Sequence, residues 1–111
     1  ALAVSATTPV DTLAGFSTHG DWIDFSGPGV SILTTSAGGR YAYRHGTSFA
    51  APMVSGTLAL MLAARPRASP EELVALLAEA AEDLGAPGPD PSFGRGRVHA
   101  RRAVERAVSP R

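Results

Sequence analysis

The sequence predicts an α/β layer fold with a buried central helix. Three observations lead to this prediction: short apolar runs typical of strands lie within residues 1–43, an uncharged apolar stretch covers 48–64, and segments with helical spacing follow it. Strands followed by helices that pack on them are typical of α/β layer folds. The 111 residues are enough for one domain, because a domain takes roughly 100–200 residues.

Four short segments have the composition of strands. The first is a continuous apolar run, as expected for a strand that is buried on both faces of a parallel sheet. Gly and Pro residues predict a turn at 26–29, and Gly38-Gly39 predicts another turn before the fourth segment. The predicted strands are 1–4, 22–25, 30–34 and 41–43.

Residues 48–64 form the predicted central helix, with no charged residue and almost no polar face. A helix that is apolar all round is either a core helix or a membrane span. Its seventeen residues are at the short limit for crossing a bilayer, and Ser55, Gly56 and Thr57 dilute its apolar character. We therefore predict a buried core helix and no membrane span, with Pro52 tolerated in the opening turn.

Two further helices are expected after the central one. Ser69, Pro70 and Glu72 form a capping-box pattern, in which side chains satisfy the free N–H groups of the first turn. This helix is expected to end at Gly85, and turns at 94–96 lead into a last short helix. The residues expected to face the core are Leu73, Leu76, Leu77, Ala80 and Leu84 in the first helix, and Val98, Ala103, Val104 and Ala107 in the second.

Charge and composition argue against several classes of protein. Ten basic residues balance ten acidic ones, giving a net charge of +0, which argues against nucleic acid or an anionic membrane as partner. Cysteine is absent, so there is no disulfide framework and no thiolate metal site. Asn and Gln are absent too, so no side-chain amide is available for catalysis. The chain begins inside an apolar run without Met, and we expect it to be a piece of a longer protein.

Ser48 stands where a polar turn passes into the apolar helix. The first turn of a helix has free N–H groups and the positive end of the helix dipole, which favour a developing negative charge. A serine there is suited to be a nucleophile whose own N–H faces the oxyanion of a tetrahedral intermediate. The alternative is a plain N-cap with no attached chemistry.

The segment 46–56, Gly-Thr-Ser-Phe-Ala-Ala-Pro-Met-Val-Ser-Gly, resembles the serine signature of the subtilisin-like serine proteases (subtilases). That signature has the form Gly-Thr-Ser-x-Ala-x-Pro followed by a helix of small residues, and a chance match at so many positions is rare. Segments 1–7, 15–30 and 93–98 resemble the family as well. The chain departs from the family pattern at Gly27, where Ala is usual, at Phe49, where many members have Met, and at His99, where Asn or Asp is usual and a local cap is weakened.

The resemblance implies that residues 1–111 are the C-terminal part of a subtilisin-like peptidase domain, an incomplete domain with a doubly wound, mostly parallel sheet. It implies a serine endopeptidase that hydrolyses peptide bonds through an acyl-enzyme at Ser48. Gly46, Thr47 and His45 are expected to form the substrate and oxyanion environment. The family's chain order is Asp, His, Ser, so the triad Asp and His and the oxyanion Asn are expected outside this chain. The isolated chain is expected to be inactive.

The resemblance also implies partners and a location. The expected partners are polypeptide substrates and the remainder of the catalytic domain, and the expected location is outside the cell or in the cell envelope. No cofactor is expected in this chain, and calcium could bind through the missing part of the domain. Asp21 and Asp24 alone fall short of the roughly six to eight oxygen ligands of calcium, so no metal site is predicted here.

Two alternatives stay open. The chain could be a non-catalytic subtilase remnant, or a scaffold or binding fragment, in which Ser48 only caps its helix. His45 could be the base, although a base also needs an orienting partner. An α/β-hydrolase elbow is excluded, because 46–50 lacks the second Gly that its sharp turn requires. Outside the site we expect a loop histidine at His19, a structural carboxylate at Asp24, and solvated loop carboxylates at Asp11, Asp21 and Asp90.

Overall fold

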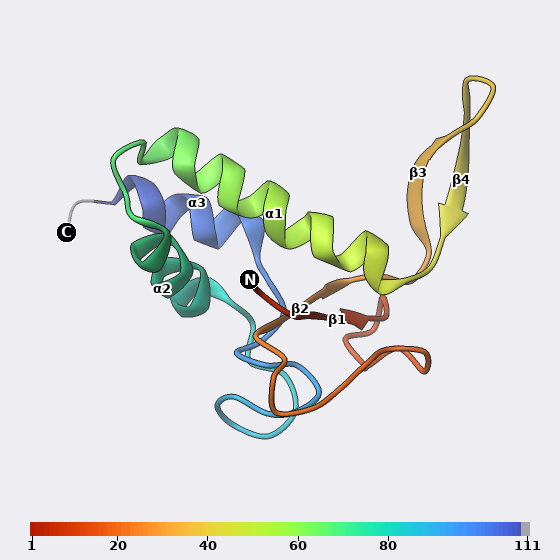
Figure 1. Ribbon diagram of the computed structural model, residues 1–111, viewed down its shortest axis with the longest axis horizontal. Helices are drawn as coiled ribbons and strands as arrows, with labels where there is room; N and C mark the ends of the chain where they lie inside the picture. Colours follow the sequence, from red (N-terminus) through yellow and green to blue (C-terminus); the bar gives the residue numbers. More distant parts are fainter. Residues whose placement is uncertain (110–111) are drawn as a thin grey trace.

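The computed structural model describes residues 1–109, which form four strands and three helices (Figure 1). In chain order these are β1 (Val4–Thr7), β2 (Phe25–Pro28), β3 (Ile32–Ser36), β4 (Arg40–Arg44), α1 (Thr47–Ala64), α2 (Pro70–Ala80) and α3 (Ala100–Val108). Strands β1 and β2 pair in parallel, whereas β3 and β4 form an antiparallel hairpin. The predicted α/β class is confirmed, with the hairpin turn at Gly38-Gly39 where the sequence predicts it.

Strands β1 and β2 each begin three residues after the predicted strands 1–4 and 22–25, and most of the predicted turn at 26–29 belongs to β2. Small residues explain this error. Ser26 and Gly27 are buried, and a Cβ on Gly27 would lie 3.0 Å from the Ala50 carbonyl oxygen of α1. Because β2 packs closely beneath α1, only small side chains fit at these positions. The segment therefore lacks the β-branched residues by which a strand is usually predicted from sequence.

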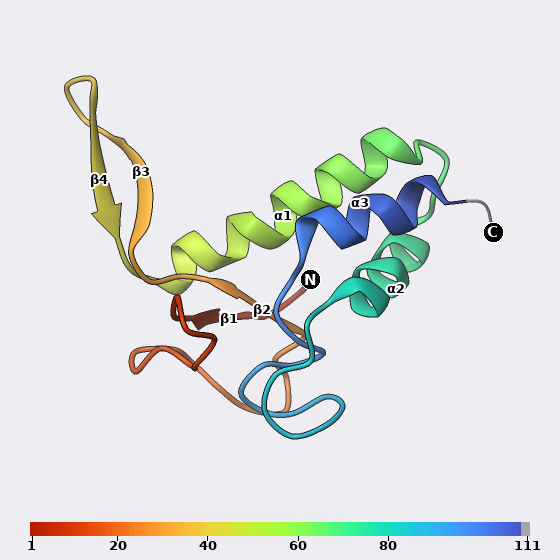
Figure 2. The same cartoon turned by 180° about the vertical axis from the view of Figure 1, so that it is seen from behind.

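The core lies between α1, the parallel strands and the other two helices. Helix α1 runs over β1 and β2, and α2 and α3 pack beside it (Figures 1 and 2). Phe25 of β2, Met61 of α1 and Leu77 of α2 are fully buried at this junction. Most residues predicted to face the core are buried there: Leu73, Leu76, Leu77, Ala80, Val98, Ala103 and Ala107. Val104 is only partly buried, and Leu84 lies beyond the end of α2.

Helix α1 is not enclosed on all sides, contrary to the prediction of a buried central helix. Its buried residues, Ala50, Val54, Thr57 and Met61, form one face, whereas Leu60 is 57% exposed and Leu62 is 44% exposed. The other described elements cover only that one face. By length and composition alone, α1 could also cross a membrane. A core helix of a soluble protein has the same two properties, so the prediction that it does not span a membrane is unchanged.

Side chains cap both C-terminal helices. The Ser69 Oγ accepts a hydrogen bond from the Glu72 backbone N–H at 3.1 Å, as the sequence predicts. The Glu72 carboxylate does not complete the capping box, because it accepts a hydrogen bond from Arg65 at 2.7 Å. His99, where the sequence predicts a weakened cap, does cap α3. Its Nδ1 accepts a hydrogen bond from the Arg102 backbone N–H at 3.2 Å. Helix α2 ends at Ala80, before the predicted stop at Gly85.

Candidate active site at the start of α1

The position of the Ser48 turn is set by Gly29, which follows β2. The Gly46 backbone N–H donates a hydrogen bond to the Gly29 carbonyl at 2.8 Å, and the Gly29 N–H donates to Thr7 of β1 at 3.1 Å. A Cβ on Gly29 would lie 2.6 Å from the Ala6 Cβ and 2.8 Å from the Gly46 carbonyl oxygen. Only glycine therefore lets the start of α1 lie this close to β1. The sequence predicts Gly29 only as a turn residue, and the Pro28-Gly29 pair is the signal for this position.

Gly46 begins the helix without a side-chain cap. It is the N-cap of α1, with a φ of 147° that L-residues with a side chain rarely adopt, and no side chain accepts a hydrogen bond there. An added Cβ would meet only ordinary van der Waals contacts with Phe49, so the backbone conformation is what requires glycine. Thr47 and Ser48 are the first two residues of α1. The structure therefore contradicts the alternative in which Ser48 is the helix cap.

Ser48 presents both its hydroxyl and its backbone N–H without a partner in residues 1–109. Its side chain is exposed, and neither its Oγ nor its N–H makes a hydrogen bond to any described residue. Both groups lie in the first turn of an 18-residue helix, where the positive end of the dipole lies. The arrangement can offer a nucleophilic oxygen and a donor to an adjacent negative charge.

Pro52 lies in the second turn of α1, not in the opening turn that the sequence predicts. In a regular α-helix the N–H of residue 52 would donate to the carbonyl of residue 48. Proline has no N–H. The Ser48 carbonyl therefore lacks the donor that it would have in an uninterrupted helix.

His45 is held by the loop that precedes β3. Its Nδ1 accepts a hydrogen bond from the Ser31 backbone N–H at 2.9 Å, and Ser31 has a positive φ of 56°. A neutral imidazole that accepts at Nδ1 carries its proton on Nε2, so neither nitrogen is free to take the proton of Ser48. This geometry favours an anchoring role for His45 and argues against the alternative in which it is the base.

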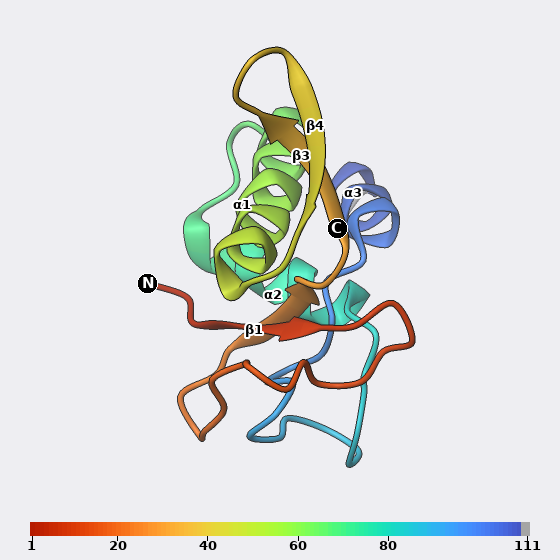
Figure 3. The same ribbon diagram turned by 90° about the vertical axis from the view of Figure 1, so that its right-hand side faces the viewer.

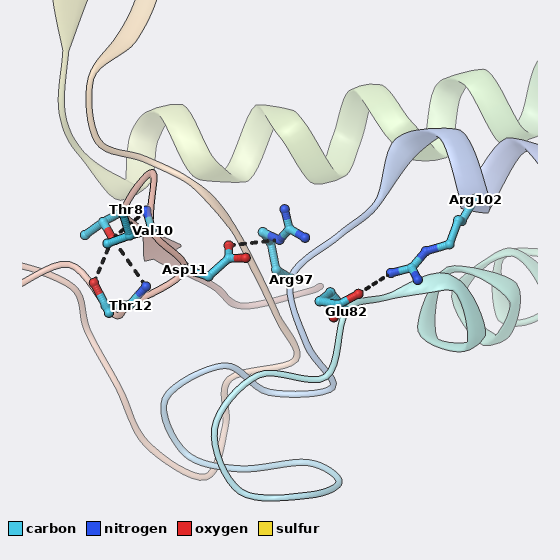
Figure 4. Close-up of polar contacts among 7 residues, drawn as sticks. All are labelled: Thr8, Val10, Asp11, Thr12, Glu82, Arg97 and Arg102. Atoms are coloured by element: carbon cyan, nitrogen blue, oxygen red, sulfur yellow. Dashed lines mark hydrogen bonds and ion pairs between the residues drawn. The ribbon is translucent and has the colours of Figure 1, made fainter.

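The remaining titratable residues considered from the sequence lie away from Ser48 in structural roles or in loops. His19 is exposed, and Asp24 accepts a hydrogen bond from the Ala3 N–H at 2.8 Å. Asp21 is exposed, as predicted. Asp11 and Asp90 differ from the expected solvated carboxylates. Asp11 forms an ion pair with Arg97 at 3.2 Å (Figure 4), and Asp90 accepts hydrogen bonds from two backbone N–H groups of its own turn.

The clearest electrostatic perturbation is structural and lies at the end of α2. The Arg102 guanidinium donates a hydrogen bond to Glu82 at 2.7 Å, and this bond together with the positive charge lowers the pKa of the Glu82 carboxyl (Figure 4). The pair joins the segment after α2 to α3. Within residues 1–109 no three acidic or histidine side chains gather closely enough to hold a metal ion.

Comparison with known proteins decides the family. Residues 1–96 match the sequence profile of the subtilase family. The chain belongs to the subtilase family. The match contains the whole Ser48 site and the β3–β4 hairpin, and it ends before α3.

Three individual proteins illustrate the similarity. The chain is 41% identical over 103 residues to the thermophilic serine proteinase of Bacillus sp. (strain AK1), a match that covers 93% of the chain and 25% of that protein. It is 38% identical over 117 residues to an extracellular protease of Xanthomonas campestris pv. campestris, covering 97% of the chain and 20% of that protein. Fervidolysin from Fervidobacterium pennivorans, a keratinolytic enzyme related to subtilisin, has a similar structure, with a TM-score of 0.84 and 32% identity over 94% of this chain and 19% of that one. The chain thus spans a quarter or less of the length of each.

Proposed function

We propose that the protein containing this chain is a subtilisin-like serine endopeptidase with Ser48 as its nucleophile. The observation that carries the proposal is the free Oγ and free backbone N–H of Ser48 in the first turn of α1. The same two groups are what acyl transfer needs, since one attacks the carbonyl and the other stabilises the resulting oxyanion. Membership of a family whose Bacillus relative is named a serine proteinase supports it.

In the proposed reaction, Ser48 Oγ attacks the carbonyl carbon of the scissile peptide bond while a histidine outside this chain takes its proton. The negative charge on the carbonyl oxygen of the tetrahedral intermediate is met by the Ser48 N–H. The histidine then protonates the leaving amine, the C–N bond breaks, and an acyl-enzyme ester remains. Water hydrolyses that ester and restores Ser48. The orienting Asp and a second oxyanion donor also come from outside the chain.

The neighbouring residues have supporting roles in this proposal. Gly46 gives the turn its positive φ, and its lack of a side chain lets the substrate backbone come close. Thr47 contributes to the oxyanion environment from the first position of α1. His45, anchored by Ser31, lines the substrate groove beside the nucleophile.

The proposal extends to partners and location. The substrates are polypeptides, and the exposed face of α1 is covered by the remainder of the catalytic domain. We propose that the protein acts outside the cell or in the cell envelope. The support is the Xanthomonas relative, which is named an extracellular protease.

The test is casein hydrolysis by the full-length natural protein and its Ser48→Ala variant. We expect kcat/KM to fall by at least about 10⁴-fold, because the nucleophile is lost, while the thermal unfolding midpoint stays unchanged. Ser55→Ala is the matched control, since it removes the same hydroxyl group two turns further along α1, outside the first turn. A Ser48→Ala variant that still cleaves casein would contradict the proposal. A folded natural protein that cleaves nothing would favour the non-catalytic alternative.

A further inference from the structure

The β3–β4 hairpin places two arginines close to Ser48 along the chain. Arg40 begins β4 and Arg44 ends it, four residues before Ser48. Since Arg40 and Arg44 are an even number of residues apart on one strand, their side chains share a face of the hairpin. Arg44 Nη2 donates a hydrogen bond to Ser36 Oγ at 3.3 Å, and Ser36 pairs with Arg40 across the hairpin. The two guanidinium groups therefore lie in the same region of this face.

Within residues 1–109, neither of these two positive charges has an acidic partner. No Asp or Glu occurs between residues 25 and 70, and no carboxylate of residues 1–109 lies within ion-pair distance of either arginine. Five of the other arginines in residues 1–109 do have such a partner, whereas Arg67 and Arg95 do not. The arginines that form ion pairs with carboxylates are Arg65, Arg97, Arg101, Arg102 and Arg106.

The hairpin stands where a bound polypeptide could reach it. It rises from the N-terminal end of α1 and projects away from β1 and β2 (Figures 1 and 3). Arg40 and Arg44 are both exposed. Four residues of chain span at most about 14 Å, so Arg44 lies within that distance of Ser48. The Arg44 side chain extends from there along the hairpin toward Ser36 and away from Ser48. An extended peptide advances about 3.3 Å per residue, so six of its residues span about 20 Å.

We propose that Arg40 and Arg44 make this peptidase favour substrates with an acidic side chain within about six residues of the scissile bond. The inference rests on the proposed function of Ser48 and adds the class of substrate. A substrate Asp or Glu supplies the carboxylate that neither arginine finds among residues 1–109. Because the contact is exposed to solvent, each arginine contributes a modest, salt-sensitive preference.

The test uses the full-length natural protein and pairs of quenched fluorescent peptides. The two peptides of a pair differ only in Asp or Asn at one position, and the pairs scan six positions on each side of the scissile bond. We expect kcat/KM for the Asp peptide to exceed that for the Asn peptide by about two- to fivefold per arginine at one or more neighbouring positions. Raising the ionic strength from about 0.01 M to about 1 M should abolish the difference, since screening shortens from about 30 Å to about 3 Å.

Variants assign the effect to the hairpin. Arg40→Gln and Arg44→Gln should each lower the ratio of kcat/KM for the Asp peptide to kcat/KM for the Asn peptide, and the double variant should bring this ratio to about one. Arg67→Gln is the matched control, because Arg67 is exposed, has no ion pair within residues 1–109 and lies beyond the far end of α1.

The possible outcomes separate this inference from the proposed function. Cleavage without any preference for Asp, or a preference that survives in the double variant, would overturn the inference and leave the peptidase intact. No cleavage of any peptide by the folded protein would overturn both.

Discussion

At the scale of single residues, the site is built by backbone groups more than by side chains. Gly29 and Gly46 fix the turn, and Pro52 removes a helical donor. Ser48 keeps its hydroxyl and N–H free of hydrogen bonds to any of the described residues. The sequence correctly predicts that Ser48 lies at the start of a helix, because a hydroxyl residue followed by an uncharged apolar run is a local sequence pattern. It does not show that Gly46 is the N-cap, since the choice depends on a φ angle.

Substituting Gly29 with Ala should loosen this turn. The new Cβ would overlap the Ala6 Cβ and the Gly46 carbonyl, so we expect the free energy of unfolding to fall by about 1–3 kcal/mol and activity to fall with it. Thermal unfolding and casein hydrolysis of the full-length protein measure both. Gly15→Ala is the control, because a Cβ at Gly15 meets nothing within 4 Å. Equal stability of the two variants would show that Gly29 does not set the helix position.

His45→Ala tests whether His45 is an anchor or a base. Loss of one hydrogen bond to Ser31 should lower kcat/KM by less than about tenfold. Ser31→Gly keeps the backbone donor and suits the positive φ, so it should change kcat/KM little. If His45→Ala were as inactive as Ser48→Ala, His45 would have to be the base.

At the scale of elements, the sequence predicts helices more accurately than strands. Ser69 caps α2 as predicted because a cap is a local interaction of neighbouring residues. Strands β1 and β2 begin three residues after their predicted starts. The residue types in these strands depend on packing against α1, which is distant in sequence. The end of α2 at Ala80 has a similar cause: the backbone of Glu82 forms two hydrogen bonds with Arg97, and the helix cannot continue to Gly85.

Ser69→Ala should weaken the start of α2. The Glu72 N–H would lose its acceptor, and we expect the free energy of unfolding to fall by roughly 1 kcal/mol, within a range of about 0.5–2 kcal/mol. Denaturant unfolding of the full-length protein measures the change. Thr18→Ala removes an exposed loop hydroxyl that bonds to no described residue and serves as control. A Ser69→Ala variant as stable as this control would show that the cap contributes nothing.

At the scale of the whole molecule, the described residues leave an apolar surface uncovered. A groove of about 810 Å³ lies between α1, α2 and the start of the chain, and its lining includes Leu2, Leu58, Leu62 and Val74. The sequence predicts that α1 is buried, but what buries it cannot be read from these residues. The similar segment makes up only 25% and 20% of two longer relatives, which is consistent with covering layers supplied by further chain.

The isolated 111-residue chain should therefore fold poorly. Its exposed apolar groove should bind the dye ANS, and the near-UV circular dichroism of Trp22 should show no cooperative thermal transition. The full-length protein should show a cooperative transition and little dye binding. A sharp transition of the isolated chain, without dye binding, would show that the described core is sufficient by itself.

The proposed reaction depends above all on Ser48 as an activated nucleophile, and labelling by a fluorophosphonate probe tests this role without a substrate. The full-length protein is treated with the probe, digested, and the modified residue located by mass spectrometry, with Ser48→Ala as control. We expect one adduct, on Ser48, that is absent from the variant. A folded protein that takes no label, or carries it on another residue, would contradict the account.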